Sequence, residues 1–306
     1  MKQIVVLSGK GGTGKTSVSA ALIHLCAKSA RSGVPVFVDA DVDAANLGLL
    51  IKPDSSSSFN FQGGSLAEID PITCINCKAC VDVCRYDAIL TDPSGKDAQW
   101  VDPIACDGCA ACVYACPQNS IQMVQQQEGV WFQSSTPFGQ FFHAELFPGR
   151  ENSGKLVTLI KQQARLFAEE NNTRVVIIDG PPGIGCPVIS ACAGTDYGLI
   201  ITEPGLSGLH DLMRVNATLK HFKIPTMLCI NKADIDPDST KNIIKYANEN
   251  QIDFLGEIPY DDSVIRAVTM GLPVTQAFPE SIATHALEDI WEKLESKSKS
   301  GEPYDK

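Results

Sequence analysis

The stretch from Gly9 to Thr16, GKGGTGKT, has the residue types and spacing that hold a phosphate chain. It fits the pattern G-x-x-x-x-G-K-[ST]. Glycines adopt positive φ angles at little cost, so backbone N–H groups can turn inward around phosphate oxygens. Lys15 adds a positive charge at the β- and γ-phosphates, and Thr16 offers a hydroxyl to Mg²⁺. The sequence therefore predicts a nucleotide site, whose residues in this loop are Gly11, Gly12, Thr13, Gly14, Lys15, Thr16 and Ser17.

Two apolar runs, each typical of a buried strand, end in aspartate. Asp39 follows Val-Phe-Val and precedes Asp41, and Asp179 follows Val-Val-Ile-Ile. Open α/β sheets bind ligands at the carboxyl ends of their strands. Mg²⁺ needs only one or two carboxylates, because it keeps several waters. These aspartates are therefore candidate magnesium ligands together with Thr16. The alternative is structural, since aspartate at a strand end often caps a helix or a turn.

Eight of the 12 cysteines lie between residues 74 and 116, in two runs with the same spacing. Each run reads C-x2-C-x2-C-x3-C, the spacing of bacterial ferredoxins, in which the fourth cysteine of a run binds the other cluster. Zinc is the alternative, because paired C-x2-C motifs also bind Zn²⁺. We expect two [4Fe–4S] clusters. The predicted ligands are Cys74, Cys77, Cys80 and Cys116 for the first cluster, and Cys84, Cys106, Cys109 and Cys112 for the second.

The remaining four cysteines are of two kinds. Cys26 lies in a predicted helix and Cys229 in a predicted strand, and both are expected in the hydrophobic core. Cys186 follows a glycine-rich stretch, and Cys192 comes soon after it. For this second pair, a role in binding or passing on metal and a purely structural role both stay open.

Composition and charge exclude several classes of protein. Hydrophobic residues make up 44% and charged residues 20%, which is typical of a globular chain. The net charge of −11 argues against nucleic-acid binding, which needs clustered Lys and Arg. The sequence has no apolar run long enough to cross a membrane. Free thiols persist in a reducing compartment, so we expect a cytoplasmic protein.

The order of the expected elements predicts an α/β fold, a mostly parallel sheet flanked by helices with an inserted α+β ferredoxin-like domain. The expected strands are 4–7, 34–38, 175–178, 198–202, 226–230 and 254–258, and the expected helices are 15–30, 154–171, 207–222, 237–250, 263–270 and 280–294. The stretch 52–64, rich in Ser, Asn and Gly, is interpreted as a linker, and 129–147 as a β-hairpin. The predicted domains are 1–63 and 129–306 for the two parts of a P-loop domain, and 64–128 for the insertion.

The phosphate loop carries a second lysine, and its K-G-G-T-G-K-T sequence resembles the deviant Walker A motif of the MinD, ParA and Mrp family. In that family the first lysine reaches the phosphates of the partner subunit's ATP in a dimer. The resemblance implies this role for Lys10, and a catalytic set of Lys10, Lys15 and Asp41, with Asp41 orienting the attacking water. Asp39 matches the neighbouring position near Mg²⁺, and Asp179-Gly-Pro-Pro-Gly resembles the family's Walker B and switch II. A solvated loop lysine is the alternative for Lys10.

A further predicted strand ends in N-K-x-D, from Asn231 to Asp234, which is superficially similar to the guanine-binding motif of GTPases. The later stretch 256–261, G-E-I-P-Y-D, resembles the adenine-side loop of MinD-like ATPases. This resemblance favours ATP and ADP over GTP, which is kept as the alternative. It implies that Asn231 contacts the base and that Pro259 packs near it.

Nearly the whole chain resembles a MinD/Mrp-type P-loop ATPase with an inserted two-cluster ferredoxin module. The resemblance implies Mg²⁺-dependent ATP hydrolysis, and an ATP-dependent homodimer or a heterodimer with a paralogue. It also implies that nucleotide state is coupled to iron–sulfur or heterometal cluster assembly or transfer. Ferredoxin-inserted members often accompany small proteins resembling dinitrogenase iron–molybdenum cofactor carriers, so a small metal-cluster carrier of this kind is the expected partner.

Two other functions stay open. One is an ATP-gated electron donor to a partner reductase, and the other is a spatial-positioning switch like MinD. The basic amphipathic membrane anchor of MinD has no counterpart at 287–294, where Glu288, Asp289 and Glu292 stand. We therefore expect no stable membrane anchor.

Overall fold

The computed structural model describes residues 1–30, 33–91, 99–149 and 153–300, and it divides into two compact units. Unit 1 consists of Met1–Phe59, Trp131–Glu145 and Ser153–Lys306, and unit 2 of Asn60–Val130 and Leu146–Asn152. The predicted insertion, 64–128, lies within the bounds of unit 2. Among the helices in the described ranges, none is both long and apolar enough to cross a lipid bilayer.

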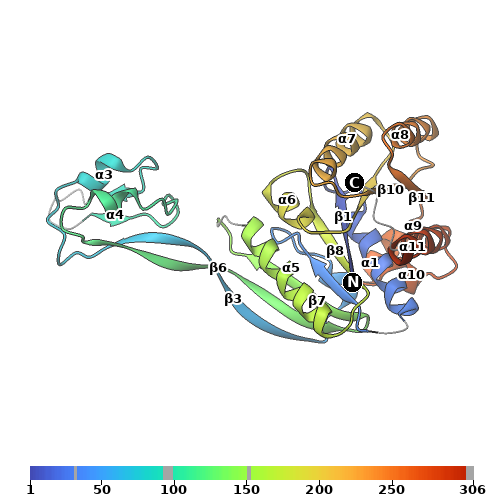
Figure 1. Cartoon of the computed structure of the whole chain (residues 1–306), viewed down its shortest axis with the longest axis horizontal. Helices are drawn as coiled ribbons and strands as arrows, with labels where there is room; N and C mark the ends of the chain where they lie inside the picture. The colour runs from blue at the N-terminus through green and yellow to red at the C-terminus, as the bar shows by residue number, and fades with distance from the viewer. Residues whose placement is uncertain (31–32, 92–98, 150–152, 301–306) are drawn as a thin grey trace. The chain divides into compact units, whose positions relative to one another are not determined.

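The chain forms a nine-stranded sheet with the order β11-β10-β9-β1-β8-β2-β7-β6-β3 (Figure 1). Unit 1 contains its strands from β11 to β7, together with the start of β3 and the end of β6. The strands are β1 (Lys2–Ser8), β2 (Val36–Asp39), β3 (Ser55–Ile69), β6 (Ile121–Thr136), β7 (Gly139–Leu146), β8 (Val175–Pro182), β9 (Tyr197–Thr202), β10 (Thr226–Asn231) and β11 (Asp253–Ile258). Every neighbouring pair from β11 to β7 runs parallel. The central strands are near-continuous buried apolar runs, because helices cover both faces of such a sheet. The predicted mostly parallel α/β fold is confirmed.

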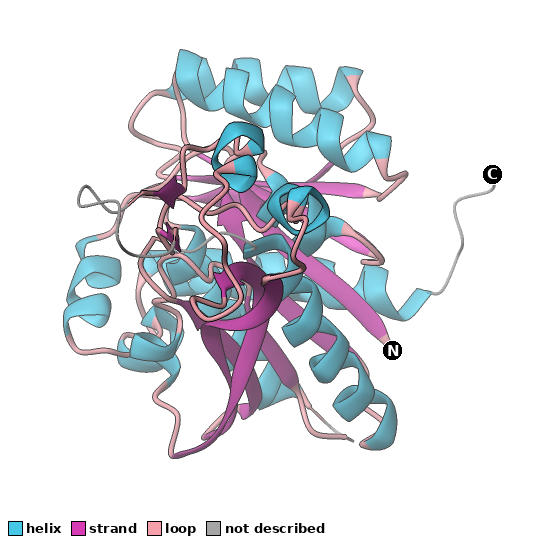
Figure 2. Cartoon of the chain, turned by 90° about the vertical axis from the view of Figure 1, so that its left-hand side faces the viewer, coloured by secondary structure: helices cyan, strands magenta, loops and turns pink. Residues whose placement is uncertain are grey.

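Helices lie on both faces of this sheet, as Figure 2 shows in cyan against the magenta strands. They are α1 (Lys15–Ser29), α2 (Gly48–Ile51), α5 (Ser153–Glu170), α6 (Cys186–Cys192), α7 (Leu206–His221), α8 (Pro237–Glu249), α9 (Asp262–Thr269), α10 (Val274–Ala277) and α11 (Ile282–Ser300). Six helices that the apolar periodicity predicts are present, with bounds that differ by a few residues. The short helices α2, α6 and α10 are additional, since their lengths are too small for a periodic pattern to show.

The core on one face of the sheet combines alternate strand residues with two long helices. Ile4 and Val6 of β1 point to the same face and pack in one buried cluster with Leu22 of α1 and Leu287 of α11. This alternation follows from the two-residue period of a strand. The phosphate loop, which connects β1 to α1, is therefore held at both ends by buried elements.

A buried lysine connects two helices of unit 1. Lys161 of α5 donates to the carbonyl oxygens of Ser190, Ala191 and Ala193 at 2.9, 2.6 and 2.8 Å, at the end of α6. The last carbonyls of a helix have no partner inside it, and Lys161 provides one. Burial lowers the pKa of Lys161 to about 8.

The linker predicted for 52–64 is wrong, because most of it lies in the strand β3. The backbone N–H of Asp54 donates to Ser135 at 2.8 Å, and the hydroxyls of Ser56 and Ser134 lie 2.6 Å apart. Phe59 stacks on Trp131 with ring centroids 4.2 Å apart. Ladder hydrogen bonds and cross-strand pairs thus form a polar strand that apolar periodicity does not reveal. The predicted hairpin over 129–147 is present, although its first strand, β6, begins earlier.

Unit 2 contains two short helices, α3 (Ala79–Val83) and α4 (Ala111–Ala115), and a small antiparallel pair, β4 (Ile89–Leu90) with β5 (Trp100–Val101). Its two halves repeat the same turns. Asp70 accepts a hydrogen bond from the backbone of Ile72 at 2.9 Å, and Asp102 accepts the equivalent bond from Ile104 at 2.9 Å. The repeat in the cysteine spacing is therefore also a repeat in backbone structure.

Candidate nucleotide site and cysteine pockets

The phosphate loop, Gly9 to Thr16, turns sharply between β1 and α1. Gly12 and Gly14 have φ angles of 81° and 83°, in the region that glycine adopts most readily. A side chain at Gly14 would also collide with Asn231, whose Nδ2 lies 2.3 Å from an added Cβ. Both glycines are thus required by backbone conformation or by close packing.

The loop also meets the chemical requirements of a phosphate site. An added Cβ on Gly11 or Gly12 would meet no atom within 4 Å, so the space beside the loop is open. The hydroxyl of Thr13 is buried and has no hydrogen-bond partner among the residues that the structure describes. A buried polar group without a partner is costly, and a phosphate oxygen beside the loop would satisfy it.

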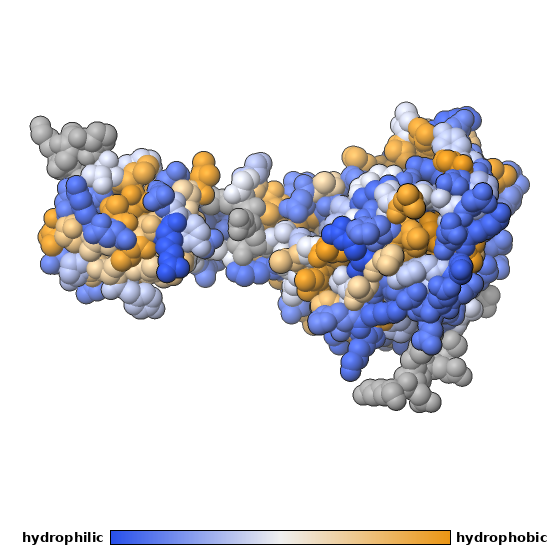
Figure 3. Space-filling model, turned by 90° about the horizontal axis from the view of Figure 1, so that it is seen from above, coloured by the Kyte–Doolittle hydropathy of each residue, from blue (hydrophilic) through white to orange (hydrophobic). Residues whose placement is uncertain are grey.

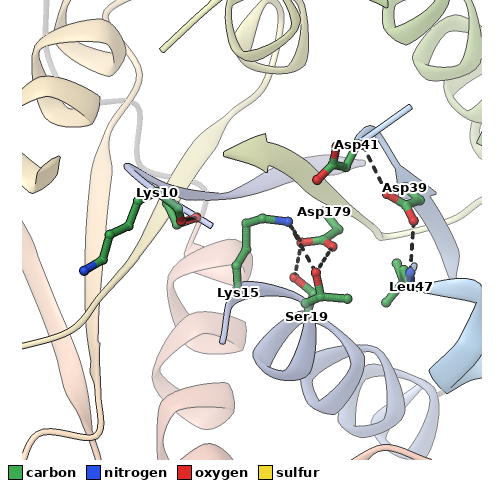
Figure 4. A network of polar contacts seen from close by, with 9 residues as sticks. Lys10, Lys15, Ser19, Asp39, Asp41, Leu47 and Asp179 are labelled. Carbon is green, nitrogen blue, oxygen red and sulfur yellow. Dashed lines mark hydrogen bonds and ion pairs between the residues drawn. The ribbon is translucent and has the colours of Figure 1, made fainter. Parts of the chain in front are cut away.

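Asp179 is the centre of a buried network at the start of α1 (Figure 4). Lys15 Nζ donates to its carboxylate at 2.8 Å, Thr16 Oγ1 at 2.9 Å and Ser19 Oγ at 2.7 Å. The carboxylate has 0% exposure. The groups that the motif assigns to phosphate and Mg²⁺ are therefore already in place, held by one aspartate from β8.

Asp39 lies beside Asp179, since the two residues are in register on the parallel strands β2 and β8. Its carboxylate accepts hydrogen bonds from the backbone N–H groups of Asp41 at 3.1 Å and Leu47 at 3.0 Å. Burial, followed by the negative charge of Asp179, raises the pKa of Asp39 to about 7. Burial also raises the pKa of Asp41. A divalent cation would relieve this crowding of negative charge beside Lys15.

Lys10 points away from Lys15 and from the three aspartates (Figure 4). Its Nζ lies 3.2 Å from the hydroxyl of Ser207 and 3.9 Å from a carboxylate oxygen of Glu203. Glu203 makes a shorter ion pair, 2.6 Å, with Lys232. The side chain of Lys10 is thus held at the protein surface by weak contacts, and it does not point to the side of its own phosphate loop where Lys15 lies.

The proposed base-binding residues lie at the ends of β10 and β11. Asn231 Nδ2 donates to the carbonyl oxygen of Thr13 at 2.8 Å, which ties this end of the sheet to the phosphate loop. Asp234 accepts a hydrogen bond from the backbone N–H of Tyr260 at 2.7 Å. The carboxylate that would recognise guanine in an N-K-x-D motif is therefore already bonded within the protein. Pro259 is half-buried directly after β11.

The eight clustered cysteines form two pockets in unit 2, each lined by four of them. The cysteines lining pocket 1 are Cys74, Cys77, Cys80 and Cys116, and those lining pocket 2 are Cys84, Cys106, Cys109 and Cys112. In each pocket, three cysteines of one run meet the fourth cysteine of the other run.

The thiols of these pockets form no disulfides, and Cys80, Cys112 and Cys116 accept hydrogen bonds from nearby backbone N–H groups. The backbone N–H of Ser120 donates to the sulfur of Cys116 at 3.3 Å. Burial is the largest single influence on Cys116 and raises its pKa, but the hydrogen bonds from the backbone and from the Ser120 hydroxyl together outweigh it and lower the pKa overall. Burial raises the pKa values of Cys80 and Cys112.

In the described ranges, no group of three or more His, Cys, Asp or Glu side chains converges on one point as ligands of a single metal ion do. A [4Fe–4S] cluster makes a different demand, because each of its four thiolates binds a separate iron atom. Four thiols lining a pocket match that demand.

The other cysteines divide as follows. Cys26 and Cys229 are buried in the core, as predicted, and burial raises the pKa of each to about 12. Cys186 is exposed at the start of α6, whereas Cys192 is fully buried at its end. These two thiols have different environments and do not form one site.

Residues 4–274 match the family described as the CobQ/CobB/MinD/ParA nucleotide binding domain. The chain belongs to this family. An uncharacterized protein of Methanocaldococcus jannaschii is 31% identical over 292 residues, which cover 95% of this chain and 96% of the relative. An iron-sulfur cluster carrier protein of Pyrococcus horikoshii is 25% identical, over 97% of this chain and 86% of the relative.

Solved structures of this family show the same fold. The septum site-determining protein MinD of Pyrococcus horikoshii, in complex with Mg-ADP, superposes with a TM-score of 0.60 at 18% identity, and the match covers 98% of each chain. A ParA family ATPase of Chlorobium tepidum has a TM-score of 0.53 at 15% identity, over 95% of this chain and 98% of the other.

Three residues at the MinD/ParA-type site were not identified from the sequence. Ser19, which bonds Asp179, lies one helical turn after Lys15, and that spacing was a usable signal. Glu203 and Ser207, which contact Lys10, are almost 200 residues away from it in the chain. No local pattern could have linked them to Lys10.

Proposed function

We propose that this protein hydrolyses ATP with Mg²⁺ in unit 1 and carries two [4Fe–4S] clusters in unit 2. In this proposal ATP hydrolysis is coupled to iron–sulfur or heterometal cluster assembly or transfer. The observation that supports this most is the presence of two four-thiol pockets in the same chain as an ordered phosphate loop. Relatives named iron-sulfur cluster carrier protein from two Pyrococcus species, 25% and 24% identical, also support it.

In this proposal the nucleotide site uses the residues gathered around Asp179. Thr16, Asp39 and Asp179 hold Mg²⁺, which supplies positive charge to the phosphate chain. Lys15 stabilises charge that develops on the β- and γ-phosphate oxygens. Asp41, half-buried beside Lys15, accepts a hydrogen bond from the attacking water and orients it.

Lys10 has a role in a second subunit in this proposal. Its contacts with Ser207 and Glu203 are weak, so the Lys10 side chain can move away from them at little cost in free energy. We expect ATP to bring two chains together, either two copies or this chain and a paralogue, with Lys10 reaching the partner's nucleotide. Light scattering tests this: ATP should double the mass of a hydrolysis-deficient protein, and Lys10→Ala should abolish the doubling.

The four thiols of each pocket are the donor set of a [4Fe–4S] cluster, which supplies one-electron storage when bound. Cys74, Cys77 and Cys80 hold the cluster of pocket 1 with Cys116. Cys106, Cys109 and Cys112 hold the cluster of pocket 2 with Cys84.

Anaerobic purification tests this part. We expect a brown protein with about eight iron and eight sulfide per chain. The paired variant Cys77→Ser with Cys109→Ser should lose most of both, whereas Cys26→Ser should keep them. Iron-free, colourless protein after reconstitution would contradict the proposal, and so would stoichiometric zinc.

An ATP-gated electron donor to a partner reductase is the second candidate, and the completeness of the thiol sets favours it. A site with four protein ligands is closed, which suits a resident group more than one that is handed on. Labelling the protein with ⁵⁵Fe separates the two functions. With ATP and a small metal-cluster carrier protein captured by pull-down, assembly or transfer moves label or metal to the carrier. Electron donation reduces the partner while all label stays behind.

A further inference from the structure

The two cysteine pockets are related by an internal repeat, which makes each a control for the other. Each cysteine of the first run has its counterpart 32 residues later. The matched thiols have nearly equal exposure: Cys80 is 7% and Cys112 is 8% exposed. Solvent access therefore does not distinguish the pockets, and differences between them must come from the other residues that line them.

The first difference is a hydroxyl group. Ser120 lines pocket 1 and is 4% exposed, and its hydroxyl and its backbone N–H both act on the sulfur of Cys116, whose pKa they lower. Its backbone N–H already donates to the sulfur of Cys116, 3.3 Å away. The counterpart of Ser120 in pocket 2 is Ala88, which is 1% exposed and has no polar atom to donate. Pocket 1 therefore offers two donors of Ser120 to sulfur, of which the hydroxyl has no counterpart in pocket 2.

The second difference is charge. Lys78 lines pocket 1, and its counterpart in pocket 2 is Ala110. Asp107 lines pocket 2, and its counterpart in pocket 1 is Ile75. Lys78 and Ala110 share the same left-handed backbone conformation, with φ angles of 66° and 61°, so the exchange of side chains is not a consequence of a different turn. At matched positions, pocket 1 carries a positive charge and pocket 2 a negative one.

Hydrogen bonds and charge act in the same direction on a reduction potential. Reduction of a [4Fe–4S]²⁺ cluster to [4Fe–4S]⁺ adds one electron and one negative charge, and no bond or proton has to move. Hydrogen bonds to sulfur and nearby positive charge stabilise the reduced form, whereas nearby negative charge destabilises it. In pocket 1 the hydroxyl of Ser120 and the charge of Lys78 both favour reduction. In pocket 2 the charge of Asp107 opposes it, and at Tyr86 in the lining of this pocket the effect of Asp107 on the pKa outweighs that of Arg85.

We infer that the two pockets have unequal reduction potentials, with pocket 1 the higher, and that Ser120, Lys78 and Asp107 set the difference. An electron that enters at pocket 2 then settles in pocket 1, which defines a direction of flow through unit 2. This inference rests on the proposed presence of two clusters. It assigns the residues around the clusters a role in setting the reduction potentials, which neither the cysteine spacing nor the family match indicates.

An anaerobic redox titration with dithionite, followed by electron paramagnetic resonance, tests the inference on the full-length protein. We expect two one-electron steps. Ser120→Ala should lower the midpoint potential of the upper step alone, and Lys78→Ala should do the same. Lys78→Arg keeps the charge and should leave this potential unchanged. Asp107→Asn should raise the lower step alone. Each change should alter the ratio of electron occupancy between the pockets by about fivefold, as expected for one hydrogen bond or one nearby charge.

The reciprocal variant Ala88→Ser guards against a trivial loss of structure. It adds the hydroxyl to pocket 2 and should raise the lower step, a gain that damage to the fold would not produce. A single two-electron step in the unmodified protein, or an upper step that Ser120→Ala leaves unchanged, would overturn the inference while the clusters themselves stand. Protein without iron would instead overturn the proposed function, and this inference with it.

Discussion

In unit 1 the phosphate loop is anchored by β1, whose last six residues are all buried, and by α1, which has nine buried residues. In unit 2 the buried hydrophobic cluster of the described residues has five members, and two of these are Cys80 and Cys112. One site is thus supported by a large core independent of its ligand. The other site has a core that includes two of its own candidate ligands, Cys80 and Cys112. Unit 1 should keep its structure without nucleotide, whereas unit 2 should depend on what its thiols bind.

The surfaces of the two units fit the same contrast. Large hydrophobic side chains stand exposed on unit 2, such as Ile72, Ile104 and Tyr114 at 91%, 88% and 90% exposure. Hydrophobic surface is visible as orange areas in Figure 3. A small unit buries a smaller share of its surface on folding than a large one, and therefore gains less stability from burial.

The largest expected effect is the response to loss of iron. Chelation under reducing conditions should unfold unit 2. When the core is small, the free energy of metal binding supplies much of the free energy of folding. Hydrogen exchange measured by mass spectrometry should then show loss of protection in α3 and α4 and unchanged protection in β1 and β8. Slow exchange of α3 and α4 in the iron-free protein would show that unit 2 stays folded without metal, contrary to the contrast drawn between the two units.

The next effect concerns catalysis in unit 1. Asp41→Ala should lower ATP turnover by about 100-fold or more, since it removes the group that is proposed to orient the water. ATP binding should stay nearly unchanged, because Lys15 and the loop remain. Asp43→Ala, an exposed neighbour, is the matched control and should keep normal turnover. Normal turnover by the Asp41 variant would show that another residue has this role.

The pH dependence of Mg²⁺ binding is a smaller effect. The pKa of Asp39, about 7, lies above its value in the unfolded chain. Folding therefore takes up a proton, and the stability of nucleotide-free protein falls as the pH rises from about 4 to 7. Mg²⁺ binds the ionised carboxylate, so Mg²⁺-dependent nucleotide affinity should rise about tenfold from pH 6 to pH 8 and then level off.

Calorimetric titrations with nucleotide in Mg²⁺ and in EDTA measure this effect, and the EDTA series corrects for protonation of the nucleotide itself. A Mg²⁺-dependent affinity that stays constant from pH 6 to pH 8 would mean that Asp39 is already ionised at pH 6.

The smallest expected effect is that of Lys10 on stability. Its contacts with Ser207 and Glu203 are long and partly exposed, so Lys10→Ala should change the free energy of unfolding by less than about 0.5 kcal/mol. Urea denaturation followed by circular dichroism measures this. A loss of several kcal/mol would show that this lysine helps to hold unit 1 together, contrary to the comparison above.

The sequence predicted what local patterns encode. Glycine and lysine spacing identified the phosphate loop, and apolar runs identified the parallel strands from β1 to β11. The family match confirms the nucleotide-binding domain. The cysteine spacing predicted the two groups of thiols that the pockets bring together, and whether they bind iron stays a prediction.

What the sequence did not predict depends on contacts between distant or polar residues. The strand β3 was interpreted as a linker because its Ser-rich start has no apolar alternation, although its pairing with β6 supplies the hydrogen bonds. The contact of Lys10 with Glu203 joins segments far apart in the chain. Such features follow from the assembled sheet and not from any short stretch of sequence.

In the finished sheet β1 lies between β8 and β9, and both of these follow unit 2 in the chain. A ribosome making the protein therefore releases the whole cysteine-bearing segment before it makes the strands that flank β1. Segments made first fold first during synthesis. In the proposed function, the nascent thiols are exposed to iron while Asp179, the proposed magnesium ligand, has not been translated. On that proposal, each new molecule is able to bind iron before it is able to bind and hydrolyse ATP.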